Sequence, residues 1–137
     1  MNRYNFDDLS IGMSARFKRK IDGKTIDCFA HFSGDFNPLH IDVDYARRSG
    51  FKDQVAHGML CSSLFSSLVG MYLPGENCLL TNISVDFLKP VFVDDELTVD
   101  GSVTQLSLAF KSAKIDATIT NQDGEVCVRA IIGVLIR

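Results

Sequence analysis

The chain has 137 residues, of which 46% are hydrophobic, and carries a formal net charge of −3 at pH 7. This length predicts one domain spanning residues 1–137, with ample apolar material for a core. The acidic balance argues against nucleic acid as the main partner, because binding phosphates favours a basic excess.

The chain is predicted to begin with a strand followed by a short helix. Residues 15–21 have strand character, and Asp22 with the glycine after it reads as a turn. Thr25 is placed to cap a helix that buries three apolar side chains and ends at Gly34.

Two further helices are predicted. The first is capped by Asp42 or Asp44 and runs to Arg48. The second, over residues 57–72, is the longest: large apolar residues recur on one side, and small ones, mostly serines, on the other. Because this helix carries no charge, we expect it to be enclosed on most sides. Its serines interrupt the ~18 apolar residues that a membrane span needs, so no membrane partner is expected.

The second half of the chain has the pattern of an antiparallel sheet. A hairpin signal stands at 121–124, where Asn, Gln, Asp and Gly join two apolar runs. One early strand, a buried helix and then a run of strands predict an α+β fold in which a sheet wraps around one helix. The predicted strands are 79–87, 96–105, 111–120 and 125–136.

The chemistry-bearing residues stand between the short helices. Asp35 and His40 flank Asn37 and Pro38, and proline favours a tight turn here because it fixes φ and restricts the preceding residue. An acid and a histidine on one rigid turn suit proton transfer. A helix beginning near Gly58 would offer amide donors to a developing negative charge.

The chain resembles the MaoC-like (R)-specific enoyl-CoA hydratases in two motifs, SGDxNPxH at 33–40 and HGML at 57–60. The order of the helices, the FLKPV break at 87–91 and the closing strands extend this resemblance over nearly the whole chain. It implies one MaoC-like domain with the hotdog fold, an antiparallel sheet wrapped around a long central helix, as a homodimer. The implied reaction is syn addition of water to trans-2-enoyl-CoA, giving (R)-3-hydroxyacyl-CoA, or the reverse dehydration. No cofactor and no metal are expected, since CoA is part of the substrate.

Chemistry assigns roles within these motifs. His40 would serve as a base for water, and Asp35 would orient that water, with the order of proton transfers left open. The Gly58 amide would stabilise the enolate oxygen, because glycine allows close approach. Asn37 would hold the turn. Ser66 matches a family position that lines the active site.

Other polar residues are interpreted as structural. His57 is expected to hold the start of the long helix, and His31 to be partly packed. Lys89 is of interest only if it lies beside the mouth of the site. The cysteines are scattered singly, which together with the absence of an apolar leader in residues 1–10 predicts a cytoplasmic protein with reduced thiols. These cysteines are Cys28, Cys61, Cys78 and Cys127.

Three alternatives remain open from the sequence. A hotdog thioesterase would direct water at the carbonyl carbon and release free CoA thiol, which a hydratase does not. A dehydratase acting on 3-hydroxyacyl carrier protein would run the reverse reaction on a different handle. A non-catalytic acyl-CoA-binding module would have no reason to keep both Asp35 and His40.

Overall fold

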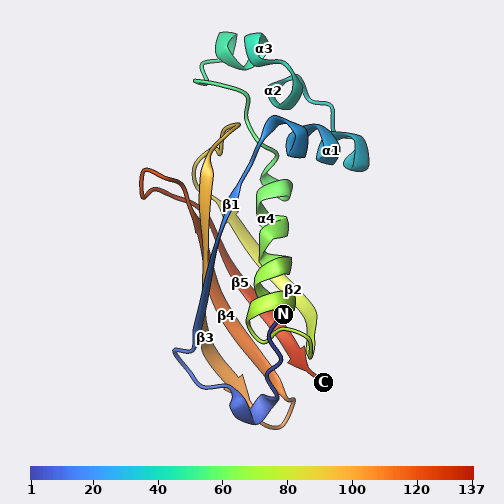
Figure 1. Cartoon of the computed structure of the whole chain (residues 1–137), viewed down its shortest axis with the longest axis vertical. Helices are drawn as coiled ribbons and strands as arrows, with labels where there is room; N and C mark the ends of the chain where they lie inside the picture. The colour runs from blue at the N-terminus through green and yellow to red at the C-terminus, as the bar shows by residue number, and fades with distance from the viewer.

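The computed structural model, which describes residues 1–137, is a five-stranded antiparallel sheet that curves around one long helix, α4 (Figure 1). The strand order is β1-β3-β4-β5-β2, so β1 and β2 form the two edges. The α+β arrangement of a sheet wrapped around a central helix is therefore confirmed. The strands are β1 (Ser14–Lys20), β2 (Cys78–Phe87), β3 (Glu96–Ser107), β4 (Ser112–Thr120) and β5 (Val126–Ile136). The helices are η1 (Phe6–Asp8), α1 (Gly23–Ser33), α2 (Pro38–Ile41), α3 (Val43–Arg48), α4 (Gly58–Ser67) and η2 (Leu68–Tyr72).

The face of the sheet that meets α4 is built by alternation along the strands. On β3, Leu97, Val99 and Val103 are buried, and the residues between them point away from the helix. Gly101 continues this inner row, where an added Cβ would lie 2.5 Å from Leu68 Cδ2. Because Gly101 has no side chain, the helix packs closely against the sheet at this point. Helix and sheet together form one cluster of 26 buried residues.

The first helix begins earlier than predicted. Asp22 is the N-cap of α1, and its carboxylate accepts hydrogen bonds from the amide of Thr25 at 2.8 Å and from its hydroxyl at 2.6 Å. The predicted turn at Asp22 and the predicted cap at Thr25 are wrong, because a turn signal and a helix start use the same residue types. The helix ends at Gly34 as predicted, with φ of 77°.

The predicted tight turn after Gly34 is a loop followed by one helical turn. Asn37 caps α2 by accepting from the amide of Leu39 at 3.0 Å, and Pro38 occupies the first helical position. Asp42 then caps α3 by accepting from the amide of Tyr45 at 2.9 Å. Of the two candidate caps for this helix, Asp42 is the one used.

The long helix is uncovered on one side, where enclosure was predicted. Met59 is 65% exposed, and Ser63 and Ser66 are exposed as well. Beside them on the edge strand β2, Leu80 is 43% exposed and Ile83 is 40% exposed. None of the helices in the structure is long and apolar enough to cross a membrane.

Candidate active site

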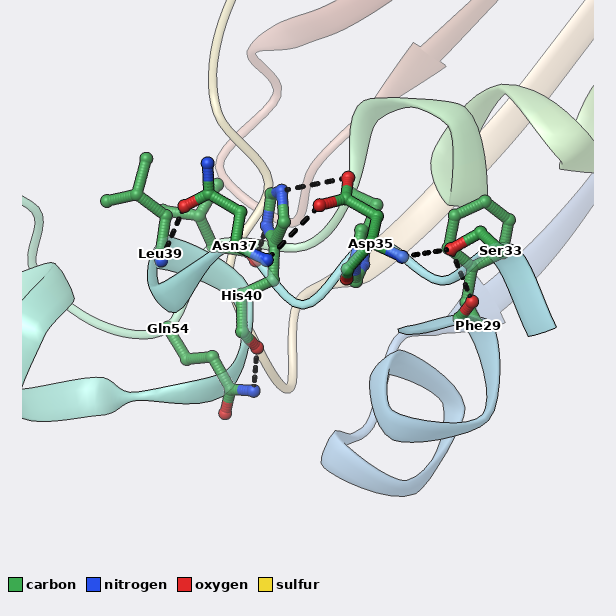
Figure 2. A network of polar contacts seen from close by, with 9 residues as sticks. Phe29, Ser33, Asp35, Asn37, Leu39, His40 and Gln54 are labelled. Atoms are coloured by element: carbon green, nitrogen blue, oxygen red, sulfur yellow. Dashed lines mark hydrogen bonds and ion pairs between the residues drawn. The ribbon is translucent and has the colours of Figure 1, made fainter. Parts of the chain in front are cut away.

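The two residues predicted to carry the chemistry face each other at one end of the sheet (Figure 2). Asp35 lies in the loop between α1 and α2, and His40 lies in α2. Asp35 Oδ2 is 3.9 Å from His40 Nε2. The Asp35 side chain is 52% exposed and that of His40 is 16% exposed, so water reaches the carboxylate while the ring is largely enclosed.

The loop that carries Asp35 is ordered by side chains that bond to nearby amides. The amide of Asp35 donates to Ser33 Oγ at 3.2 Å, and the amide of Asn37 donates to Asp35 Oδ1 at 3.2 Å. Short polar side chains commonly stabilise turns in this way. One carboxylate oxygen is thereby held by the loop, and the other is directed toward His40, as Figure 2 shows.

The hydrogen bonds of His40 fix which ring nitrogen is free. Its Nδ1 lies 2.8 Å from the carbonyl oxygen of Val55. Since a carbonyl only accepts, Nδ1 carries the proton in this contact, and in the neutral ring Nε2 keeps its lone pair. Gln54 also donates through its amide to the main-chain carbonyl of His40. The nitrogen that faces Asp35 is therefore the basic one.

A hollow of about 280 Å³ opens beside His40, lined mainly by hydrophobic residues. Cys61 lines it from the first turns of α4, and burial raises the pKa of this thiol to about 12. The thiol therefore stays protonated and is a poor nucleophile. Lys89 also lines the hollow, but it pairs with Glu125, and this hydrogen bond raises the pKa of Lys89.

Gly58 is the first residue of α4 and lines the same hollow. A first-turn amide has no partner within its own helix, so its N–H is available to a ligand. The ring of Phe87 lies against this glycine, with an added Cβ only 3.0 Å from Phe87 Cε1. A larger residue at position 58 would therefore push the Phe87 ring away from the helix start.

His57 is almost fully buried, at 2% exposure, and contacts both members of the pair. Its Nε2 lies 2.9 Å from the main-chain oxygen of Asp35, and its ring stacks on that of His40 with centroids 3.8 Å apart. His57 is the N-cap residue of α4, at the helix start as expected, but its side chain makes no capping bond and instead contacts the loop that carries Asp35. The sequence hid this contact because it joins residues 22 positions apart.

Ligand atoms of Asp35, His40 and His57 lie within 4.8 Å of one another, which is close enough for a shared metal ion. A metal bound to imidazole lies near the plane of the ring, along the nitrogen lone pair. The two histidine rings are stacked, with only 29° between their planes, so these planes do not meet between the rings. His57 Nε2 is also engaged by a carbonyl. The three side chains thus form a hydrogen-bonded and stacked cluster whose lone pairs do not converge on one ion.

The remaining candidate residues have different locations. Asn37 lies beside the pair as the cap of α2, consistent with the supporting position expected for it. Ser66 is exposed on the uncovered side of α4 and is not among the residues that line the hollow. His31 is exposed at the end of α1, where its ring meets the ring of Phe36 edge-on at 5.2 Å.

A second hollow, of about 340 Å³, lies on the face of the sheet away from α4. Its polar residues include Asp100, Asp116 and Arg129. No histidine lines it and no helix begins there, so it offers neither a neutral base nor a helix start. The acid–base geometry is found at the hollow beside His40.

Comparisons with known proteins identify the family of the chain and proteins of similar structure. The MaoC-like domain matches residues 8–124 of the chain. The (R)-specific enoyl-CoA hydratase of Aeromonas caviae is 38% identical over 120 residues, which cover 88% of this chain and 90% of that protein. The protein of the same name from Rhodospirillum rubrum is 39% identical over 101 residues, covering 74% and 70%. The solved (R)-hydratase from A. caviae, involved in PHA biosynthesis, superimposes with a TM-score of 0.91 at 36% identity, covering 94% of this chain and 98% of that one.

Proposed function

The chain belongs to the MaoC-like domain family, and on that premise we propose that it is an (R)-specific enoyl-CoA hydratase. It adds water to trans-2-enoyl-CoA to give (R)-3-hydroxyacyl-CoA, and it catalyses the reverse dehydration. The observation that carries the proposal is the Asp35 carboxylate 3.9 Å from the free nitrogen of His40, beside a mainly apolar hollow. Relatives that bear this activity in their names match most of the chain.

The pair has the spacing to hold the reacting water. A water that donates to two acceptors at about 2.8 Å each separates them by roughly 4.4 Å. Asp35 and His40 are slightly closer, at 3.9 Å, so one water reaches both. One proton of this water passes to His40 Nε2 as its oxygen attacks C3, and Asp35 holds the other proton and orients the oxygen. The proton held on His40 is then delivered to C2 on the same face, which regenerates the neutral base and gives syn addition.

The enolate that forms after attack needs a hydrogen-bond donor. The Gly58 amide at the start of α4 serves this role, aided by the positive end of the helix dipole. One such donor is typically worth about 2.7–4 kcal/mol of barrier. Asn37 supports the site indirectly, because its cap fixes the start of the helix that carries His40.

A homodimer completes this proposal. The edge strand β2 and the uncovered side of α4 together expose Met59, Leu80, Ile83 and Phe87, and exposed flat edges invite pairing with another chain. Joining two sheets edge to edge at β2 buries these side chains. Ser66, on the same side of α4, then becomes part of an enclosed acyl tunnel instead of an exposed surface.

The whole chain is proposed to act as one MaoC-like hotdog domain in the cytoplasm. Its four cysteines are all free, as suits a reducing compartment. No cofactor is needed, because the proposed roles are filled by side chains and one backbone amide. The substrate is an acyl-CoA thioester, so CoA enters as part of the substrate and not as a cofactor.

Incubation with crotonyl-CoA tests the proposal. Hydration removes the conjugated enoyl absorbance and leaves the thioester intact, and chiral analysis should show the (R) product alone. A thiol reagent run in parallel detects a thioesterase, since only hydrolysis frees CoA thiol. A third reaction with crotonyl carrier protein shows whether the enzyme prefers a carrier-protein thioester to the CoA thioester. Release of thiol, formation of the (S) product, or no turnover of either thioester would refute the hydratase.

A further inference from the structure

His57 is a buried histidine that touches both members of the catalytic pair but has no part in the proposed proton transfers. It is 2% exposed, and its Nδ1 is buried without a hydrogen-bond partner. Buried polar atoms are rarely left unpaired without a reason, since the cost of desolvating them is not recovered. We infer that His57 is a positioning residue for hydration: it holds the main chain of Asp35 and presents a neutral ring face to His40. This inference rests on the proposed hydratase function.

The protonation state of His57 follows from its contacts. The main-chain oxygen of Asp35, 2.9 Å from Nε2, only accepts hydrogen bonds, so the proton of His57 is on Nε2. A second proton on Nδ1 would be buried with no acceptor in reach. His57 is therefore held as the neutral Nε2–H tautomer.

This neutral state matters because of the ring stacked on it. The centroids of the His57 and His40 rings are 3.8 Å apart, with 29° between the planes. When His40 takes a proton from water it becomes a cation, and a second cation at this distance would repel it. A neutral His57 ring avoids that repulsion and keeps the His40 ring from tilting away. The Asp35 carboxylate, with Oδ2 3.9 Å from His40 Nε2, is a charged group that faces the two rings, and Lys89 lines the same hollow as His40.

The contact with Asp35 matters because the loop has little else to hold it. Asp35 is exposed and lies outside any helix or strand, and its other bonds are to Ser33, the last residue of α1, and to Asn37, the N-cap of α2. His57 joins the loop to the start of α4, the element that also carries the Gly58 amide. Phe29 of α1 supports the His57 ring from another direction, with centroids 5.0 Å apart. These contacts fix the position of Asp35 relative to the Gly58 amide.

Two substitutions separate the two contacts. His57→Phe keeps an aromatic ring against His40 but removes the donor to Asp35, and His57→Gln keeps a donor of similar reach but removes the ring. Misplacing a reacting group by about 1 Å can cost about 10²-fold. We expect His57→Phe to lower kcat on crotonyl-CoA about 10²-fold and His57→Gln about tenfold, with KM changed less than about threefold. His31→Gln, which changes an exposed histidine that contacts Phe36 but neither Asp35 nor His40, is the matched control and should keep wild-type kcat.

Circular dichroism and sedimentation establish that each variant is folded before kinetics are compared. Wild-type kcat in both folded variants would overturn the inference, as would a loss confined to KM. A loss in His57→Gln as large as in His57→Phe would overturn the contact with Asp35. Because wild-type turnover is measured in the same series, an inactive wild type counts against the hydratase proposal instead.

A second measurement does not depend on turnover. The chain has only 3 histidines, so long-range ¹H–¹⁵N spectra of ¹⁵N-histidine-labelled protein resolve each ring, with His31→Gln identifying one. Near neutral pH we expect His57 protonated at Nε2 alone and His40 at Nδ1 alone. An imidazolium or an Nδ1–H tautomer at His57 would overturn the inference even if the enzyme is fully active.

Discussion

Replacing Asp35 by Asn removes a charge while preserving the local structure of the loop. Asn retains an oxygen that accepts from the amide of Asn37, so the loop bond at 3.2 Å can persist. What is lost is the negative charge 3.9 Å from His40 Nε2 and the ability to exchange a proton. The structure allows the size of each loss to be worked out separately.

The electrostatic loss is modest. At 3.9 Å an ion pair of Asp35 with protonated His40 is worth about 4 kcal/mol at an effective dielectric constant of about 20 and about 1 kcal/mol in water. Because the Asp35 side chain is 52% exposed, the lower value is closer, about 1–2 kcal/mol, or roughly 5–30-fold in rate. General acid–base catalysis contributes about 10²–10⁴-fold. A loss above about 10² therefore requires that Asp35 handles the water and not merely the charge on His40.

Crotonyl-CoA turnover by Asp35→Asn, His40→Gln and the double variant tests this reasoning. We expect each single change to lower kcat at least about 10²-fold, with KM and the unfolding transition nearly unchanged. The double variant should be little worse than the worse single one, because both residues act on one water. His31→Gln serves as the control. Near-full activity in both folded single variants would refute the catalytic assignment. A loss of only about tenfold in Asp35→Asn would mean that Asp35 only stabilises the positive charge on His40 and does not handle the water.

Three further outcomes are expected. Gly101→Ala places a Cβ 2.5 Å from the helix side chain above it, and urea unfolding should show a loss of about 1–3 kcal/mol. The hydrogen bonds from Thr25 lower the pKa of Asp22 below its ordinary 3.8. The stabilisation that ionised Asp22 gives the fold is therefore present above pH 3.8 and is lost as pH falls through the lowered pKa. The free energy of unfolding of Asp22→Asn should accordingly depend less on pH in acid than that of the wild type. Ile83→Lys puts a charge on the exposed edge strand and should give monomers in sedimentation at micromolar concentration, whereas Ile11→Lys, outside that edge, should leave the dimer intact; a monomeric wild type would contradict the proposed dimer.

Much of the sheet could be predicted from the sequence. The bounds of β2 to β5 lie within about two residues of the predicted strands, and the hairpin at 121–124 joins β4 to β5 as expected. The π-helical turn η2 was not predicted as such, because its apolar spacing differs little from that of an α-helix over five residues. The register shift in β2 near Leu80 likewise depends on pairing with β5.

The site was predictable where its residues are close in sequence. Asp35 and His40 were identified because one short motif holds both, and the structure brings them within 3.9 Å. The partners of His57 were not predicted, because they are set by how α4 docks against the loop, which no local pattern encodes. The exposure of Ser66 and the open side of α4 also escaped prediction, since apolarity alone does not say whether the same chain or another one covers a surface.

The segment that carries both members of the catalytic pair is attached to the rest of the fold by little buried surface. Helices α1 to α3 stand together at one end of the sheet (Figure 1), and of residues 23–48 only Ile26 belongs to the main core cluster. Regions with few buried contacts open at lower free energy than the strands of a core. The acid and the base therefore rest on a small cooperative unit of their own. Such a unit can loosen while the sheet stays folded, which gives a bulky thioester a route in and out that leaves the core undisturbed.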